Sequence, residues 1–238
     1  DLGALQNLVS SSMSSPQYSH SSGFLSLGVA CSTLDTDNIS PGFRVAYDSI
    51  KKAVFGYPDN VITKELVESI PFATLSLQIG KGPKGLLVLE ELNDEGSLWV
   101  SRDKVYIRLV NGRIVRTLGL NNNLKSYFSP DILFYNLVKE ERPVFKEFYA
   151  YYSYDEPELN NLRTKVQIRQ ISEELITILG KDRKVLLFEE KVQNEYLGWE
   201  FSNLYWVDYE DGFVWKSSQH ISPKLPEFKI EITKKPAI

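Results

Sequence analysis

Apolar and polar residues alternate with a period of two along most of the chain from Val61 onward. This alternation is typical of strands that bury one face, and the segments are rich in Val, Ile, Tyr, Phe and Thr, which fit a pleated surface. We therefore expect a mostly β, antiparallel fold, irregular only between residues 121 and 143. The pattern predicts strands over residues 73–79, 86–92, 98–101, 105–110, 113–118, 145–154, 164–171, 175–179, 185–192, 199–202, 204–209, 213–218 and 228–232.

A helical spacing of apolar residues appears near the N-terminus. Apolar side chains recur three or four positions apart between Phe43 and Val54, which predicts one amphipathic helix over residues 42–55. Residues 1–30 carry a single formal charge and many serines, so we interpret them as a leader or a remnant outside the fold. Residues 31–60 then form a polar tether followed by the helix.

Two blocks of predicted strands align without a gap at an offset of about 100 residues. Ten of the 44 positions in the range 75–118 are identical to their counterparts, among them Trp99 with Trp199. The alignment predicts an internal repeat, with two related antiparallel β units over residues 61–143 and 144–238 that pack together. The alternative is that any two antiparallel meanders look alike at this level.

Composition narrows the function classes. The net charge is −4, whereas nucleic-acid binders usually carry a basic field, so we expect no nucleic-acid partner. No apolar run approaches the roughly 18 residues that a transmembrane helix needs. The chain has one cysteine, Cys31, which excludes an internal disulfide.

The motifs of familiar enzymes are missing from the sequence. It contains no G-x-S-x-G elbow, no H-E-x-x-H and no Walker loop, and His220 is the one histidine outside the leader. The adjacent pairs Glu90-Glu91 and Glu189-Glu190 lie in predicted strands and point to opposite faces, so neither pair can flank one glycosidic bond. We therefore predict no catalytic residue, no metal site and no cofactor.

Cys31 ends a short apolar run, GFLSLGVAC, that begins at Gly23. Met13 lies 18 residues before it, a plausible start for a signal peptide that is cleaved before a lipidated cysteine. Two features differ from such signals: no Lys or Arg precedes the run, and Gly28 stands where Leu is usual. The alternative is that Cys31 is an ordinary small apolar residue.

Several short segments follow one another in a characteristic order. They are AVFG at 53–56, IPFAT at 70–74, NGRIVRT at 111–117, LNNNL at 120–124, WVD at 206–208, GFVWKSSQ at 212–219 and KP at 235–236. Through these segments the chain from about Cys31 to Ile238 resembles the YjbF-type, or group 4 capsule polysaccharide, lipoproteins. This resemblance implies a periplasm-facing lipoprotein, anchored in the outer membrane through Cys31, whose partners in the same system make or export capsule or exopolysaccharide. It carries over no catalytic residue.

Three functions fit these observations. The first is an accessory protein of polysaccharide secretion that binds the polysaccharide or an export partner, which requires exposed aromatic rings with polar neighbours. The second is a structural partner of an outer-membrane protein without sugar contact, which requires a flat apolar patch. The third and least favoured is a carbohydrate-active hydrolase or lyase, which requires two carboxylates about 5–9.5 Å apart in a cleft.

Hairpin geometry gives a candidate ligand face. Asn111-Gly112 predicts a two-residue type I′ turn, because both of its positions need φ > 0, and Asp211-Gly212 predicts a second hairpin turn. Pairing across the first turn predicts a core face with Val105, Ile107, Leu109, Ile114, Arg116 and Leu118. The outward face would carry Tyr106, Arg108, Val110, Arg113, Val115 and Thr117. The repeat transfers this assignment to the second hairpin at an offset of 100 residues. The outward face there, which could bind a ligand or partner, would carry Trp206, Asp208, Glu210, Phe213, Trp215 and Ser217. The alternative is that these aromatic rings pack inside the protein.

Overall fold

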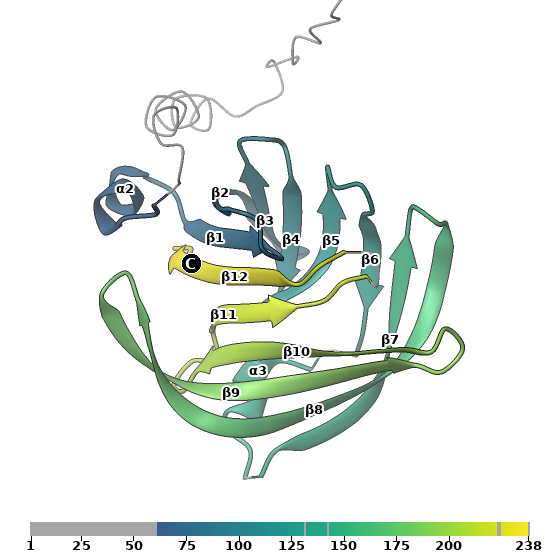
Figure 1. The fold of residues 1–238 in the computed structure, drawn as a ribbon. Coiled ribbons are helices and arrows are strands. Elements are labelled where there is room, and N and C mark those ends of the chain that lie inside the picture. The colour runs from purple at the N-terminus through teal and green to yellow at the C-terminus, as the bar shows by residue number, and fades with distance from the viewer. Residues whose placement is uncertain (1–60, 131, 142, 223–224, 238) are drawn as a thin grey trace, which may run out of the picture. The chain divides into compact units, whose positions relative to one another are not determined.

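The computed structural model describes residues 61–130, 132–141, 143–222 and 225–237. These residues form one twelve-stranded antiparallel sheet and two short helices (Figure 1). The mostly β, antiparallel fold predicted from the sequence is thus confirmed. The predicted leader, Cys31, the tether and the helix over 42–55 lie outside the described residues.

The elements follow one another from the helix α2 to the strand β12, and both helices are short. Within the described residues neither helix is long and apolar enough to cross a membrane. The bounds are α2 (Lys64–Ser69), β1 (Thr74–Ile79), β2 (Lys84–Asn93), β3 (Gly96–Ser101), β4 (Tyr106–Val110), β5 (Arg113–Leu118), β6 (Leu124–Phe128), α3 (Phe134–Leu137), β7 (Phe145–Tyr154), β8 (Leu159–Ile178), β9 (Lys181–Asn194), β10 (Trp199–Asp208), β11 (Val214–Gln219) and β12 (Phe228–Lys234).

The helix α2 was not predicted, because six residues are too few to show a helical period. Its start is capped by Thr63, whose hydroxyl accepts a hydrogen bond from the backbone N–H of Leu66 at 3.2 Å. Lys64 and Glu68 face each other one turn apart, and Val67 is buried. The helix ends at Ser69, and its C-cap Ile70 has an extended backbone because the following Pro71 disfavours a helical residue ahead of it.

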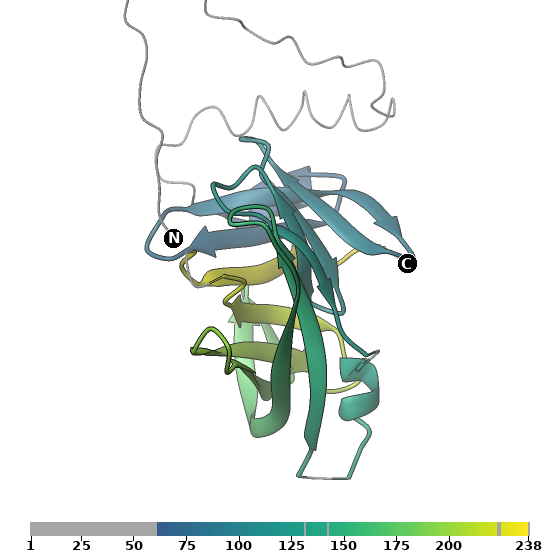
Figure 2. The same cartoon turned by 90° about the vertical axis from the view of Figure 1, so that its right-hand side faces the viewer.

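The strand order in the sheet is β5-β4-β3-β2-β1-β12-β11-β10-β9-β8-β7-β6. Neighbours in the sheet are also neighbours in sequence except at one place, where β1 pairs with β12. The sheet is strongly curved, so that it is nearly closed and barrel-like, and its end strands β5 and β6 come together (Figures 1 and 2). There the backbone N–H of Leu124 donates to the hydroxyl of Thr117 at 2.9 Å. The apolar core fills the inside of this curve, with Leu75, Ile107 and Phe188 fully buried.

Most predicted strands are present, and the exceptions have local causes. The predicted strands 164–171 and 175–179 are parts of the single strand β8, where a bulge next to Ser172 accommodates the polar residues between them. The predicted strands 199–202 and 204–209 are parts of β10, in which the polar residue between them, Asn203, is buried. The segment expected to be irregular contains β6 and α3.

The structure does not show the internal repeat. At an offset of 100 the turn between β3 and β4, residues 102–105, corresponds to the middle of β10, where the chain runs straight. One strand therefore stands where the first block has two antiparallel strands. The sheet also continues past residue 143, since strands from both predicted units pair directly through β1 and β12.

The two predicted turns differ in length. Asn111 and Gly112 have φ of 49° and 76°, which confirms the type I′ turn. In the second hairpin the backbone N–H of Asp208 donates to the carbonyl of Phe213 at 2.7 Å, so four residues lie between these two bonded residues. The predicted hairpin turn at Asp211-Gly212 is present, but it is longer than the first, so residue pairing cannot be transferred between the hairpins.

Candidate functional site

A bulge in β5 alters the faces predicted for the first hairpin. Leu109 pairs with Ile114 as expected, but Arg108 pairs with Arg116, so Val115 is an extra residue in β5. Beyond the bulge every side chain changes face. Leu118, expected in the core, is 52% exposed, whereas Thr117, expected outside, is buried.

A second bulge disrupts the predicted ligand face on β10 and β11. Trp206 pairs with Lys216 and Val207 pairs with Val214, which leaves Trp215 as the extra residue. Ser217 therefore points inward, is 1% exposed and accepts a hydrogen bond from the amide of Gln219 at 2.8 Å. Its predicted outward position is wrong.

The remaining predicted face residues already contact the protein's own charged groups. Trp206, half-buried, donates to the carboxylate of Glu174 at 2.8 Å. Trp215 is 6% exposed, donates to Asp208 at 2.8 Å and lies 3.3 Å under the guanidinium carbon of Arg183. The exposed aromatic surface expected here is not present, because Trp215 is covered. Phe213 packs edge-on against Trp215, and Glu210 is exposed.

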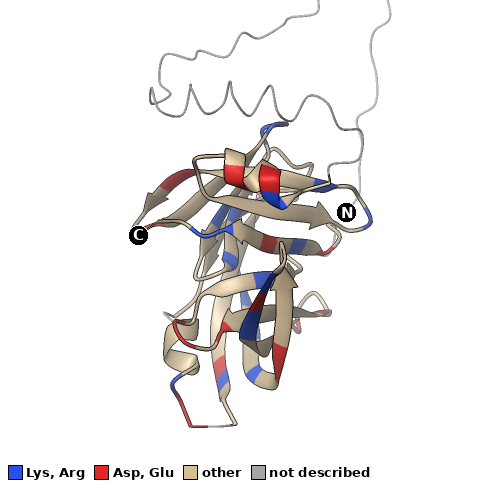
Figure 3. Ribbon diagram, turned by 90° about the vertical axis from the view of Figure 1, so that its left-hand side faces the viewer, with Lys and Arg blue, Asp and Glu red and all other residues tan. Residues whose placement is uncertain are grey.

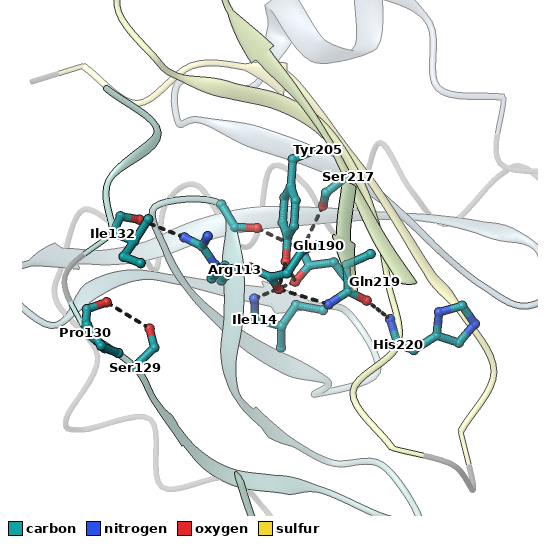
Figure 4. Close-up of polar contacts among 12 residues, drawn as sticks. Arg113, Ile114, Ser129, Pro130, Ile132, Glu190, Tyr205, Ser217, Gln219 and His220 are labelled. Carbon is teal, nitrogen blue, oxygen red and sulfur yellow. Dashed lines mark hydrogen bonds and ion pairs between the residues drawn. The ribbon is translucent and has the colours of Figure 1, made fainter. Parts of the chain in front are cut away.

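A buried polar cluster lies inside the curve of the sheet (Figure 4). Its centre is an ion pair in which Nε of Arg113 donates to Oε2 of Glu190 at 2.9 Å, with both side chains buried. The other carboxylate oxygen accepts from the amide of Asn203 at 3.2 Å and from the hydroxyl of Tyr205 at 3.1 Å. Arg113, predicted to point outward, is therefore an interior residue.

Gln219 extends this cluster across the interior. Its carbonyl oxygen accepts from the backbone N–H of Ile114 at 2.9 Å, and its amide donates to the carbonyl of Gly112 at 2.8 Å (Figure 4). These bonds connect β11 to the start of β5, which is distant from β11 in the strand order. The cluster thus ties opposite sides of the curved sheet together.

Two residues of the cluster, Arg113 and Tyr205, have raised pKa values. Burial is the largest single influence and lowers the pKa of Arg113, but the Glu190 carboxylate, Tyr127 and Tyr205 together outweigh it, so the net pKa of Arg113 is raised. Burial, assisted by the same carboxylate, raises the pKa of Tyr205 well above its usual value. Both shifts move the pKa further from neutral pH, which makes neither group suited to general acid–base catalysis.

A strip of aromatic rings, three of them exposed and one half-buried, lies on the outer side of β6 and β7. We call Phe128, Phe145, Tyr149 and Tyr151 the aromatic strip. Phe128 is 69% exposed, and it pairs with Tyr151, with the ring centroids 6.4 Å apart. The guanidinium carbon of Arg163 lies 3.7 Å from the centre of the Tyr149 ring. The structure thus places exposed aromatic rings with polar neighbours here, and not on β10 and β11.

This aromatic face was not predicted from the sequence. The segment 145–154 reads FKEFYAYYSY, so aromatic residues occupy both sides of the strand. Phe148 and Tyr152 point inward and are buried, whereas Phe145 and Tyr149 are exposed. Alternation of apolar with polar residues could not separate two aromatic faces.

No group of three or more His, Cys, Asp or Glu residues that could hold a metal ion occurs in the part of the chain that the structure describes. His220 is half-buried, and its ring lies 5.8 Å from that of Phe201. Its backbone N–H donates to Asn203 at 2.8 Å. The surroundings of His220 are thus those of a packed side chain.

A solved structure has the same kind of fold, a strongly curved β-sheet. The hypothetical lipoprotein YmcC of Escherichia coli (K12) superposes with a TM-score of 0.64 at 21% identity, over 80% of this chain and 96% of that chain. Sequence comparison agrees with this similarity. The chain is 30% identical to lipoprotein GfcB of Escherichia coli over 77 residues, which span 32% of this chain and 36% of GfcB. It is 22% identical to lipoprotein YjbF of the same organism over 176 residues, 73% of this chain and 81% of YjbF.

A match over most of the chain identifies the family. Residues 47–233 match the family described as Group 4 capsule polysaccharide lipoprotein gfcB, YjbF, and the chain belongs to this family. The resemblance noted from the sequence is thus confirmed. Neither the family description nor the names of these relatives states a catalytic activity.

Proposed function

We propose that the protein is a non-catalytic, periplasm-facing lipoprotein that assists secretion of a surface polysaccharide and contacts the polymer through the aromatic strip. The observation that carries this proposal is the exposure of these rings beside charged side chains, in a member of a capsule lipoprotein family. A sugar ring offers apolar C–H faces and a rim of hydroxyls. Aromatic rings bordered by hydrogen-bonding groups match both features.

The polar groups along the strip belong to neighbouring strands. On β7, Glu147 lies between the strip residues and is bonded to Lys165 at 3.0 Å and to Gln167 at 2.8 Å, both on β8. These exposed groups can exchange their mutual bonds for bonds to hydroxyls at low cost, since surface ion pairs contribute little. The arrangement extends along one strand, which suits a linear polymer.

The charge distribution agrees with a partner that carries little net charge. Figure 3 shows Lys and Arg interspersed with Asp and Glu on the side of the sheet away from β6 and β7, and beside the strip Glu147 is paired with Lys165. A mixture of both signs produces no strong field of one sign to attract a highly charged partner. Stacking and hydrogen bonding, which do not depend on net charge, would then dominate recognition.

Tyr149→Ala should weaken binding of the capsule or exopolysaccharide from the same organism by about tenfold, because each 1.4 kcal/mol of lost contact is a factor of ten. Isothermal titration calorimetry with the purified polymer measures this. The matched control is Tyr196→Ala, which removes a ring that is 92% exposed in the β9–β10 connection. Equal affinities for the Tyr149 and Tyr196 variants would refute a role for the strip.

We propose further that Cys31 carries the lipid anchor and that the outer membrane is its location, because Ser32 follows the cysteine and not the Asp of inner-membrane retention. Cys31→Ala should then move the protein from the membrane fraction to the soluble fraction, since acyl chains supply the membrane affinity. Sedimentation of envelopes followed by immunoblotting is the measurement. A Cys31→Ala form that still sediments with membranes would contradict the anchor.

A structural partner of an outer-membrane protein is the second candidate function. It is favoured by the exposure of Phe128 and Phe145, apolar rings with no hydrogen-bonding group of their own. Cross-linking of the lipidated protein in envelopes distinguishes the two functions. The second candidate would be favoured by two results together: the unmodified chain does not bind the polymer, and Tyr149→Ala loses a specific protein cross-link.

A further inference from the structure

The seam where the sheet nearly closes contains a cavity. The end strands β5 and β6 meet at Thr117 and Leu124, and from there they run toward Arg113 and Phe128 (Figure 1). Between these later positions lies a cavity of about 200 Å³. This volume is comparable to that of one sugar ring with its substituents.

One residue in the wall of the cavity, Arg113, has a buried hydrogen-bond donor that is not satisfied by the described protein. Arg113 uses Nε for Glu190 and donates from Nη1 to the carbonyl of Ile132 at 3.1 Å. Its guanidinium carbon also lies 4.6 Å from the centre of the Phe134 ring. The remaining nitrogen, Nη2, is buried and has no hydrogen-bond partner among the described residues. A buried donor without a partner carries a desolvation cost that a bound acceptor would remove.

The walls of the cavity suit a ring with apolar faces. Besides Arg113, they include Val110, Val115, Tyr127, Phe128 and Ile132. Phe128 is also part of the aromatic strip, so the strip and the cavity form one continuous surface. A polymer lying along the strip could therefore place one of its residues in the cavity.

The charges around the cavity favour an uncharged occupant. The positive charge of Arg113 is already balanced by Glu190, and both side chains are buried. A carboxylate bonded to Arg113 would give its group with the buried Glu190 a net negative charge, which is costly where the pair is shielded from water. A hydroxyl or an N-acetyl carbonyl oxygen can accept from Nη2 without this cost.

We propose that the seam cavity is a binding site for one uncharged sugar residue, such as a hexose or an acetamido-hexose, whose acceptor oxygen bonds to Nη2 of Arg113. This inference rests on the proposed function for its choice of ligand class. It adds to that function the site, the donor and the preference for a neutral residue over a uronic acid.

Saturation-transfer difference NMR on the full chain tests the site with three probes: glucose, N-acetylglucosamine and glucuronate. At least one neutral sugar should receive saturation from the protein, and glucuronate should receive about tenfold less. Val115→Phe, which fills the cavity from a half-buried position in β5, should abolish the signal of the neutral sugar. Tyr149→Ala should retain it, because Tyr149 does not line the cavity.

Ile132→Phe fills the cavity from outside the strands and gives a second test if Val115→Phe does not fold. The inference is wrong if no neutral sugar receives saturation, if glucuronate is preferred, or if the signal survives in a folded filled variant. If one of these results is obtained but the polymer still binds and its binding depends on Tyr149, the cavity site is wrong and the proposed function is still supported. A cavity signal without any polymer binding would support the site and count against the proposed function.

Discussion

Replacing Glu190 with alanine should lower the free energy of unfolding by about 3–5 kcal/mol, the usual cost of removing one partner from a buried ion pair. The substitution leaves the guanidinium of Arg113 in the interior without its counter-charge. It also removes the acceptor for Asn203 and Tyr205. Urea denaturation followed by tryptophan fluorescence measures the loss.

The control is the preceding residue in the same strand. Glu189 points outward and pairs at 2.7 Å with Arg169, a largely exposed partner. Surface pairs contribute about 0–1 kcal/mol, so Glu189→Ala should be nearly neutral. In the double variant Arg113→Met/Glu190→Leu no charge is left unpaired, and stability should recover in part. If Glu189→Ala and Glu190→Ala lose equal stability, the interior cluster does not brace the sheet.

The orientation of this pair of glutamates was predictable, but the partner was not. Adjacent residues in a strand point to opposite faces, and Glu189 and Glu190 do so. The partner Arg113 is 77 residues away and was assigned to the outer face. Its inward position depends on how the far end of the sheet curves back, and this curvature is not encoded in local alternation.

Local structure was predictable from the sequence where the residues of that segment alone determine it. Asn111 and Gly112 form the expected turn, because their backbone preferences determine φ. The pairing of β1 with β12 joins segments about 150 residues apart, and no motif in either segment indicates it. Sheet topology therefore came only from the structure.

The predicted ligand face failed for an identifiable reason. The transfer by 100 residues assumed equal turns and unbroken register, whereas the second hairpin has a longer loop and a bulge at Trp215. One extra residue turns the following side chains to the other face. Ser217 thus entered the interior, and Arg183 covered Trp215. A bulge leaves no clear mark in a single sequence, so this error could not be avoided from pattern alone.

Gly212→Ala should cost about 2–5 kcal/mol of unfolding free energy. The residue has φ of +69°, where alanine is strained by about 1–2 kcal/mol. A Cβ atom there would also press against the backbone of α3, 2.5 Å from the nitrogen of Tyr135, and overpacking of this kind typically costs about 1–3 kcal/mol. A backbone cannot rotate aside as a side chain can, so α3 itself would have to move.

The movement of α3 connects this loop to the interior cluster. Phe134, at the start of α3, is buried against Phe188 and Tyr205 and lies under the guanidinium of Arg113. Gly180→Ala is the matched control, since Gly180 has φ of +75° but no atom within 4 Å of its Cβ position. It should lose only the backbone strain, about 1–2 kcal/mol. Urea denaturation of both variants separates strain from contact: a Gly212→Ala loss no larger than that of Gly180→Ala would mean that α3 is not pressed against this loop.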